Sequence, residues 1–139
     1  MQGEDFRKMF KTYQFQAGTG KHTVYLMATA TESGIMIHLI GGEVPHLGAV
    51  VLSLPRPSRS NPERTSCTTS VLPLAAHKDE LAAKMVAETI TRQISKPVTV
   101  AAGLHIKNAT QKDIITLMQN SRNAALQLID AMQKDFSFS

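Results

Sequence analysis

The stretch HTVYLMATATESGIMIHLI, residues 22–40, decides the fold class of this chain. Its first part, residues 22–31, is rich in β-branched side chains and alternates between two faces, which is typical of a strand. Ser33-Gly34 supplies a turn, and residues 35–40 continue as a second, almost wholly apolar strand. The pattern predicts two antiparallel neighbours joined by that turn.

Further strands are predicted on both sides of this hairpin. Residues 13–16 alternate between apolar and polar side chains and predict a short strand. Residues 47–54 are apolar on both faces, so we expect a strand that is covered on both faces. Residues 55–62 contain three prolines, which predict a long loop. Residues 66–74 return to β-branched composition and predict one more strand.

Two helices flank a last strand in the second half of the chain. Residues 78–95 show helical spacing at Leu81, Met85, Val86, Ile90 and Ile94. Residues 98–106 predict a strand, and Thr110 and Asp113 form a capping signature for a final helix. The apolar face of this final helix is predicted to contain Ile114, Met118, Ala125, Ile129, Met132 and Phe136. We therefore expect one α+β domain over residues 1–139, with a mainly antiparallel sheet and helices on one side.

Composition and charge limit the classes of function. The net charge is +4, but the basic residues are scattered, and aromatic residues make up only 5% of the chain. Nucleic-acid readers use basic patches and stacking aromatics, so we expect no nucleic-acid partner. The single cysteine, Cys67, excludes an internal disulfide, and no apolar run approaches the roughly 20 residues of a membrane span. These features favour a cytoplasmic protein without a membrane segment.

Three histidines lie at junctions between predicted elements. They are His46, His77 and His105, and imidazoles gathered at one edge of a sheet are suited to a divalent metal. Asp79 or Glu80 would add an oxygen ligand. The gaps between the histidines match no compact ligand motif. The alternative is that each imidazole bonds a loop carbonyl or caps an element. His22 is expected to face solvent, with a role as a fourth ligand as its alternative.

A second candidate site is an anion contact. Gly41-Gly42 allows close backbone approach, and the forked guanidinium groups of Arg56 and Arg59 suit a phosphate. The alternative is that both arginines are simply solvated. The hydroxyls and thiol of residues 66–70 raise nucleophilic catalysis as a further option, but the chain has no nucleophile elbow, Walker loop or dinucleotide fingerprint.

The order of the motifs is more specific than any one of them. Together they resemble the prenylated flavin chaperone-like family, which includes the small D subunit associated with gallate decarboxylase. The similarity spans roughly residues 18 to 130. The motifs are, in order, Gly41-Gly42-x-x-Pro45-His46-x-Gly48-Ala49-Val50, Pro55-Arg56-Pro57-Ser58, Thr69-Ser70-Val71, His77-Lys78-Asp79, and Ala102-Gly103-Leu104-His105-Ile106 with Asn108.

The resemblance implies an accessory protein that is not itself the decarboxylase. Such a protein binds prenylated FMN or FMN, and delivers it to, or assembles with, a UbiD-type aromatic acid decarboxylase. It also implies a fold like that of the proteasome assembly chaperones, and a homodimer. The alternative function is a small metal-dependent enzyme that uses a three-histidine site.

The resemblance also carries site residues onto this chain. It maps the family's histidines to His46, His77 and His105, the candidate metal ligands, and its loop arginine to Arg56. Two positions depart from the family pattern: Ala76 replaces a common glycine, and Lys107 replaces a common acid, so Lys107 offers a phosphate contact instead of a metal ligand. The full cofactor-binding set predicted from the motifs is Gly41, Gly42, His46, Arg56, Ser58, Arg59, Lys107 and Asn108.

Overall fold

The computed structural model describes residues 6–74 and 77–136, without the side chains of His77, Lys78 and Phe136. The predictions for Ala76 and for the side chain of Phe136 therefore lie outside the described part. The elements, in chain order, are β1 (Phe10–Ala17), the 3₁₀ turn η1 (Gly20–His22), β2 (Val24–Thr31), β3 (Ile35–Gly42), β4 (Ala49–Pro57), β5 (Thr65–Pro73), α2 (His77–Ile94), β6 (Val98–His105) and α3 (Gln111–Phe136).

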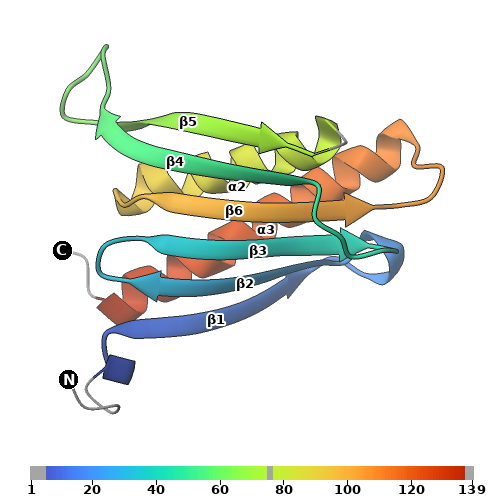
Figure 1. Cartoon of the computed structure of the whole chain (residues 1–139), viewed down its shortest axis with the longest axis horizontal. Coiled ribbons are helices and arrows are strands. Elements are labelled where there is room, and N and C mark those ends of the chain that lie inside the picture. The colour runs from blue at the N-terminus through green and yellow to red at the C-terminus, as the bar shows by residue number, and fades with distance from the viewer. Residues whose placement is uncertain (1–5, 75–76, 137–139) are drawn as a thin grey trace.

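The strands form one sheet with the order β1-β2-β3-β6-β4-β5. Its neighbours are antiparallel except β3 and β6, which run parallel and pair from Ile35 with Val98 to Gly42 with His105. The predicted hairpin is confirmed as β2 and β3, joined at Ser33-Gly34. In Figure 1 both helices lie behind the sheet, on the same side. The expected α+β class, mainly antiparallel with helices on one face, is confirmed.

The hydrophobic core lies between the sheet and the two helices. α2 packs against β4, β5 and β6, α3 packs against β1 and β2, and the two helices contact each other. Alternate strand residues such as Val24, Leu26, Ile37 and Val100 fill this layer with almost no exposure. One helix residue was wrongly predicted: Leu81 is exposed, and the buried positions next to it are Ala82 and Ala83. These alanines let α2 lie close to the sheet.

The other face of the sheet has no helix over it. The register places Leu52 and Leu54 on this face, with exposed fractions of 43% and 46%. The expectation that strand 47–54 is covered on both faces was therefore wrong, because the two helices lie on the same side. We call this side of the sheet the bare face. The strand residues that the register assigns to it are Phe10, Thr12, Gln14, Gln16, Tyr25, Met27, Thr29, Thr31, Met36, His38, Ile40, Gly42, Val50, Leu52, Leu54, Arg56, Ser66, Thr68, Ser70, Leu72, Thr99, Ala101, Gly103 and His105.

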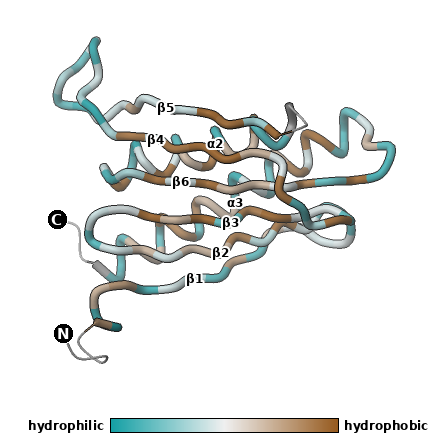
Figure 2. The backbone as a smooth tube through the Cα atoms, in the orientation of Figure 1, coloured by the Kyte–Doolittle hydropathy of each residue, from teal (hydrophilic) through white to brown (hydrophobic). Residues whose placement is uncertain are grey.

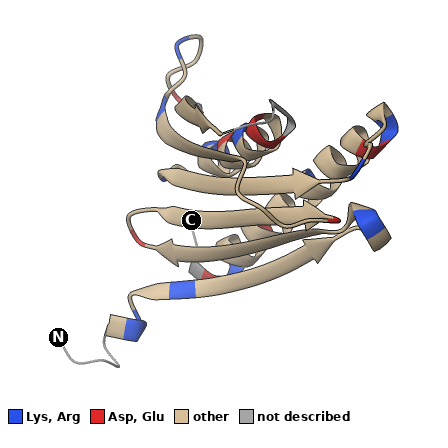
Figure 3. Ribbon diagram, turned by 45° about the vertical axis from the view of Figure 1, so that its right-hand side comes forward, with Lys and Arg blue, Asp and Glu red and all other residues tan. Residues whose placement is uncertain are grey.

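The bare face is nearly free of charge. Among all six strands only Lys11 and Arg56 are charged, and Lys11 belongs to the helix side, where it pairs with Asp135 of α3. Figure 3 shows blue and red confined largely to helices, loops and strand ends. In Figure 2 hydrophobic colour runs along the middle of β3, β4 and β6. Arg56 is thus the single charged residue of the bare face.

The proline-rich segment is only partly a loop. β4 extends through Pro55, Arg56 and Pro57, and pairs with β5 as far as Pro57 with Thr65. Its pairing with β6 ends earlier, at Ser53 with Val98. Beyond Ser53 β4 is therefore an edge on that side, where prolines are tolerated because no ladder donor is required. The loop was predicted to begin at residue 55, and this was wrong, because residues 55–57 still belong to β4. The hairpin turn covers residues 58–64.

The first turn of α3 confirms the capping signature and holds the η1 turn in place. Asp113 N donates to Thr110 Oγ1 at 3.1 Å, and Thr110 N donates to Asp113 Oδ2 at 2.9 Å. The other carboxylate oxygen of Asp113 lies 2.7 Å from His22 Nε2. We expected His22 to face solvent. Instead, its ring contacts Asp113 and anchors η1 to the helix. Within the described residues no helix is both long and apolar enough to cross a membrane.

Candidate functional site

The candidate site lies where the parallel neighbours β3 and β6 end together. Gly42 pairs with His105 at this end, and residues 43–48 then cross β6 to reach β4 (Figure 1). Carboxyl ends of parallel strands are common places for ligand sites, because loops that diverge there leave space between them. We call this place the histidine edge.

Two glycines allow the backbone to pass closely at the histidine edge. Gly42 has φ +79°, and a Cβ at this position would overlap the backbone of His105. A Cβ on Gly103 would overlap the carbonyl oxygen of His46. The segment that contains His46 therefore lies directly on β6, and only glycine at position 103 permits this.

His46 is held by a completely buried carboxylate. Its Nε2 lies 2.8 Å from Oδ2 of Asp79, whose side chain has no exposed surface. The second oxygen, Oδ1, accepts a 2.7 Å hydrogen bond from Leu104 N. Asp79 is in the first turn of α2, where the helix dipole favours a negative charge. Gly48 makes room for this carboxylate, since a Cβ there would overlap Oδ2.

Both ring nitrogens of His46 lie next to an oxygen atom. Its Nδ1 lies 3.2 Å from the carbonyl oxygen of Val44, while Nε2 faces Asp79. One acceptor is a backbone carbonyl and the other a carboxylate, and each contact is a hydrogen bond when the ring nitrogen that faces it carries a proton. The ring is 34% exposed. It therefore presents part of an imidazole ring to a ligand at this edge.

His105 is the second histidine brought to this edge. Its ring centroid lies 6.0 Å from that of His46, with the rings perpendicular. The backbone of His105 is fixed by Glu43 N, which donates to its carbonyl oxygen at 2.6 Å. Two of the three predicted histidines are therefore adjacent, which the spacing of the sequence alone did not establish.

The metal prediction is not tested by these contacts. Among the described side chains there is no group of three His, Cys, Asp or Glu residues that could hold a metal ion. The side chain of His77 lies outside the described part, although its backbone begins α2 two residues before Asp79. His46 also directs Nε2 at Asp79 rather than into open space. A site of His46, His77 and His105 therefore stays a prediction.

Lys107 and Asn108 follow β6 at the same edge. Lys107 N donates to Glu43 Oε1 at 2.8 Å, which joins the loop after β6 to the loop after β3. Asn108 has φ +53°, a left-handed conformation that turns the chain toward α3. Gly41, Gly42, His46, Lys107 and Asn108, out of the predicted cofactor-binding set, are thus gathered at one edge.

The three other predicted contacts lie at the opposite end of β4. Arg56 is seven residues beyond Ala49, about 23 Å along an extended strand. There its Nε donates to Thr68 Oγ1 at 2.9 Å and its Nη1 to the carbonyl oxygen of Pro57 at 3.1 Å. Ser58 Oγ lies 3.1 Å from Ser60 Oγ in the hairpin turn, which also contains Arg59. One chain therefore does not bring the arginines and the histidine edge together.

The hydroxyls and the thiol of β5 are engaged in contacts away from the histidine edge. Cys67 is buried opposite Pro55, near the arginine end of the sheet. Thr69 Oγ1 donates to Glu88 of α2 at 2.5 Å and also contacts Ser53. These side chains tie β5 to its neighbours, and the histidine edge is at the other end of the strand.

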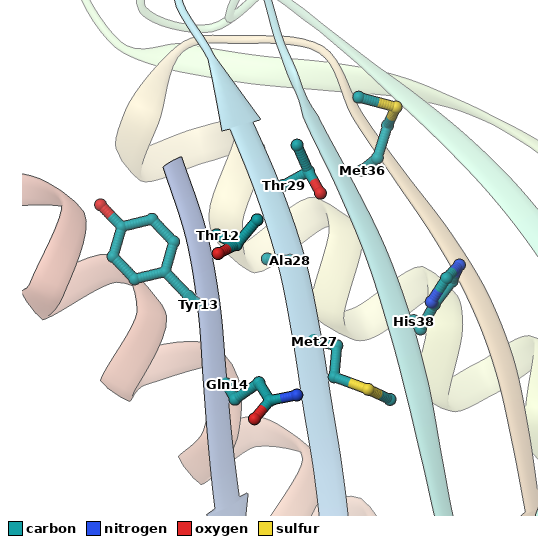
Figure 4. Close-up of a pocket in the computed structure, with 8 residues that line it drawn as sticks. All are labelled: Thr12, Tyr13, Gln14, Met27, Ala28, Thr29, Met36 and His38. Carbon is teal, nitrogen blue, oxygen red and sulfur yellow. The ribbon is translucent and has the colours of Figure 1, made fainter. Parts of the chain in front are cut away.

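A shallow hollow on the bare face was missed by sequence reasoning. It has a volume of about 690 Å³, and Figure 4 shows Met27, Met36 and His38 on neighbouring strands along it, while Tyr13 turns away toward the helices. Tyr13 instead donates to Asp135 of α3 at 2.9 Å. The sequence did contain an indication of it: the residues of β2 and β3 that face away from the helices include none of the charged residues expected on a strand that faces solvent.

Comparison with a solved structure defines the class of fold. The chain matches a structure described as "Crystal Structure of a Novel Chaperone Complex for Yeast 20S Proteasome Assembly" with a TM-score of 0.57 and 17% sequence identity, over 91% of this chain and 97% of that chain. At this identity the likeness concerns the fold alone, which is that of a proteasome assembly chaperone.

A family model identifies the family more narrowly. The model of the prenylated flavin chaperone LpdD-like domain matches residues 18–133, and the chain belongs to this family. The resemblance derived from the motifs is thereby confirmed. No individually curated protein matches the chain significantly in sequence.

Proposed function

We propose that this protein binds prenylated FMN and supplies it to, or assembles with, a UbiD-type aromatic acid decarboxylase. Membership in the prenylated flavin chaperone family supports an accessory role. The observation that carries the proposal is the histidine edge, where His46 and His105 lie next to each other beside Lys107.

The chemistry of the histidine edge fits the phosphate end of a flavin nucleotide. The carboxylate of Asp79 is buried and already bonded to two donors, so it does not repel an anion as an exposed carboxylate would. His46 offers a partly exposed imidazole ring, and the close approach at Gly42 and Gly103 fixes the surrounding backbone. Charge-assisted contacts of this kind are the strong ones in phosphate binding.

Titration with FMN and with prenylated FMN, followed by flavin fluorescence, tests the proposal. We expect saturable binding by the wild type, and binding about 10-fold weaker in His105→Gln and in Lys107→Gln, because each loses one charge-assisted or polar contact. Lys134→Gln is the matched control, since Lys134 lies on α3 and pairs with Asp130 in solvent. No saturable binding of either flavin by the wild type would overturn the proposal.

Delivery is tested separately with the partner enzyme. Apo-decarboxylase mixed with the flavin-loaded protein is expected to gain activity faster than apo-enzyme given the same amount of free prenylated FMN. Equal rates would leave a flavin-binding protein without a delivery role. Repeating the titration with and without added Mn²⁺ or Zn²⁺, together with metal analysis of the purified protein, tests the three-histidine metal site and the alternative metal-dependent enzyme.

A further inference from the structure

β5 is an outer strand of the sheet, and half of its backbone groups point away from β4 (Figure 1). Arg64 O accepts from Ser58 N just before β5, and Leu74 N donates to Gly48 O just after it. The pairing between these two points is continuous, residue for residue. Because backbone groups alternate in direction along a strand, the even-numbered residues of β5 point toward β4 and the odd-numbered ones point outward. From the described part of the chain, no hydrogen bond reaches the outward N–H groups, which are those of Thr65, Cys67, Thr69 and Val71.

We infer that the outer edge of β5 is the docking edge for an extended, acidic segment of a partner protein, which pairs with it as a further strand. A row of free donors and acceptors at strand spacing matches only another extended backbone, and this is how strand addition works in peptide recognition. The inference goes beyond the proposed flavin function and does not depend on it.

β5 lacks the features that keep other strands from pairing. Sheet edges are commonly protected by charged side chains, prolines, bulges or very short strands. β5 has nine residues, Thr65–Pro73, without a charge, and its one proline is the last residue. At the opposite edge, by contrast, Gln127 of α3 donates to the carbonyl oxygen of Gln16 in β1 at 3.1 Å. The two edges therefore differ, and the edge of β5 is the open one.

α2 lies along the helix side of β5 and forms a floor for an added strand. Ser95 Oγ lies 2.9 Å from Thr65 Oγ1, and Thr69 Oγ1 donates to Glu88 at 2.5 Å. Leu81 comes seven residues before Glu88, about two helical turns, so it lies on the same side of α2 near the end of β5. Its side chain is 56% exposed. A strand added beside β5 would cover this leucine, which the core of one chain does not use.

The exposed charges of α2 along this edge are mainly positive. Lys84 and Arg92 lie one turn before and one turn after Glu88, and both are exposed. The carboxylate of Glu88 is mostly covered and already accepts the hydrogen bond of Thr69. The floor therefore favours carboxylates on the added segment.

The hairpin turn before β5 adds positive charge at the other end of the edge. Arg59 and Arg64 are exposed there and outnumber Glu63, and Figure 3 shows blue in this hairpin. A second copy that paired edge to edge would bring the same cations together, which is unfavourable. The charges thus favour an acidic segment of another protein over a second copy of this chain.

Peptide selection identifies a probe for the edge. The whole protein is used as bait for a phage-displayed library of random peptides of about ten residues, the upper length of ordinary strands. Enriched peptides are expected to combine β-branched residues with Asp or Glu. No enrichment, or enrichment of basic peptides, would overturn the inference.

Amide hydrogen exchange of the protein with the selected synthetic peptide tests where it binds. Even-numbered amides of β5 are expected to be protected already in the free protein. The amides of Thr65, Cys67, Thr69 and Val71 are expected to become protected only when the peptide is bound. Protection gained on the bare face or at the histidine edge instead would overturn the docking edge.

Proline substitution tests the backbone pairing. Val71→Pro removes one outward N–H and leaves the bonds to β4 in place, so peptide binding is expected to weaken about 10-fold. Val71→Ala is the matched control, because it loses the same side-chain packing but keeps the N–H. Thr65→Pro with Thr65→Ala replaces this pair if Val71→Pro does not fold. Equal affinities of the proline and alanine variants would overturn strand addition.

Two further measurements separate the charge and the occupant. Arg64→Gln is expected to weaken peptide binding and to reduce its dependence on salt, whereas Lys134→Gln on α3 is expected to change neither. Light scattering is expected to give equal masses for Val71→Pro and Val71→Ala. A lower mass for Val71→Pro alone would show that a second copy occupies the edge and would overturn the inferred partner.

Discussion

Asp79 bonds His46 and the backbone of Leu104 at the same time, although its side chain is completely buried. One carboxylate therefore connects three segments that are distant in sequence: the loop after β3, the end of β6 and the first turn of α2. A buried carboxylate is stable only when it is fully paired, and here each oxygen has a partner.

Replacing Asp79 is expected to destabilise the fold. Asp79→Ala leaves the buried Leu104 N–H without its acceptor and should cost about 2–3 kcal/mol of unfolding free energy, measured by urea denaturation. Asp79→Asn keeps an acceptor and should cost less. Asp130→Ala is the control, because this exposed residue pairs with Lys134 in solvent, and a change within about 0.5 kcal/mol is expected. Equal losses for Asp79→Ala and Asp130→Ala would contradict this role.

Gly103→Ala is expected to displace the segment that contains His46. The added methyl group meets a backbone oxygen, which no side-chain rotation relieves, so a loss of about 3 kcal/mol is expected. Gly20→Ala is the comparison: its Cβ has open space, and only the positive φ of 58° costs about 1 kcal/mol. NMR shifts of the His46 ring should change in Gly103→Ala alone. The prediction fails if Gly20→Ala is the more damaging change.

The stability of the fold is expected to fall in acid through Asp113. Hydrogen bonding from the Thr110 backbone, then from His22, holds the pKa of this carboxyl below its ordinary value. A carboxyl with a lowered folded-state pKa stabilises the fold fully above its unfolded value of about 3.9, and this stabilisation is lost as pH falls toward the folded value. Asp113→Asn should therefore be less stable than wild type at neutral pH, with a difference that shrinks in acid. A difference independent of pH in urea unfolding would be inconsistent with this role.

Tyr13 is expected to ionise only at unusually high pH. Burial, followed by the hydrogen bond and negative charge of Asp135, raises the pKa of its phenol. In a Tyr25→Phe variant, which leaves Tyr13 as the single tyrosine of the sequence, absorbance should show ionisation above the ordinary value of about 10. Tyr13→Phe should cost about 1 kcal/mol of stability through loss of the bond to Asp135. Ionisation near 10 would disprove the buried contact.

Much of the fold could be predicted because local patterns carry it. The hairpin of β2 and β3 follows from alternation around Ser33-Gly34, and the start of α3 follows from the capping pair Thr110 and Asp113. The bare face could not be predicted from β4 alone. An apolar strand looks the same whether its second face meets a helix or another molecule, and only the placement of both helices on one side distinguishes these cases.

The candidate site could be predicted only in part, because it also depends on how the strands are ordered in the sheet. Histidines at element ends were a valid signal, but which of them meet depends on strand order, and β6 lies between β3 and β4. That order brings His46 to His105 and sends Arg56 to the far end of β4. The partner of His46 could not be read from the sequence: Asp79 or Glu80 was offered as an oxygen ligand for a metal, and the two oxygens of Asp79 bond an imidazole and a backbone amide.

The extension of β4 beyond β6 has a consequence for aggregation. Ser58 N donates a hydrogen bond to Arg64 O in the hairpin, so the backbone groups of Ser58 point toward β5. Because backbone groups alternate in direction along a strand, the backbone nitrogens of Pro55 and Pro57 point away from β5, toward the side that β6 leaves open. An amide hydrogen there would invite a strand from another molecule to pair with this open stretch. The two proline rings remove both donors and so protect the sheet from strand addition at the place where it is incomplete.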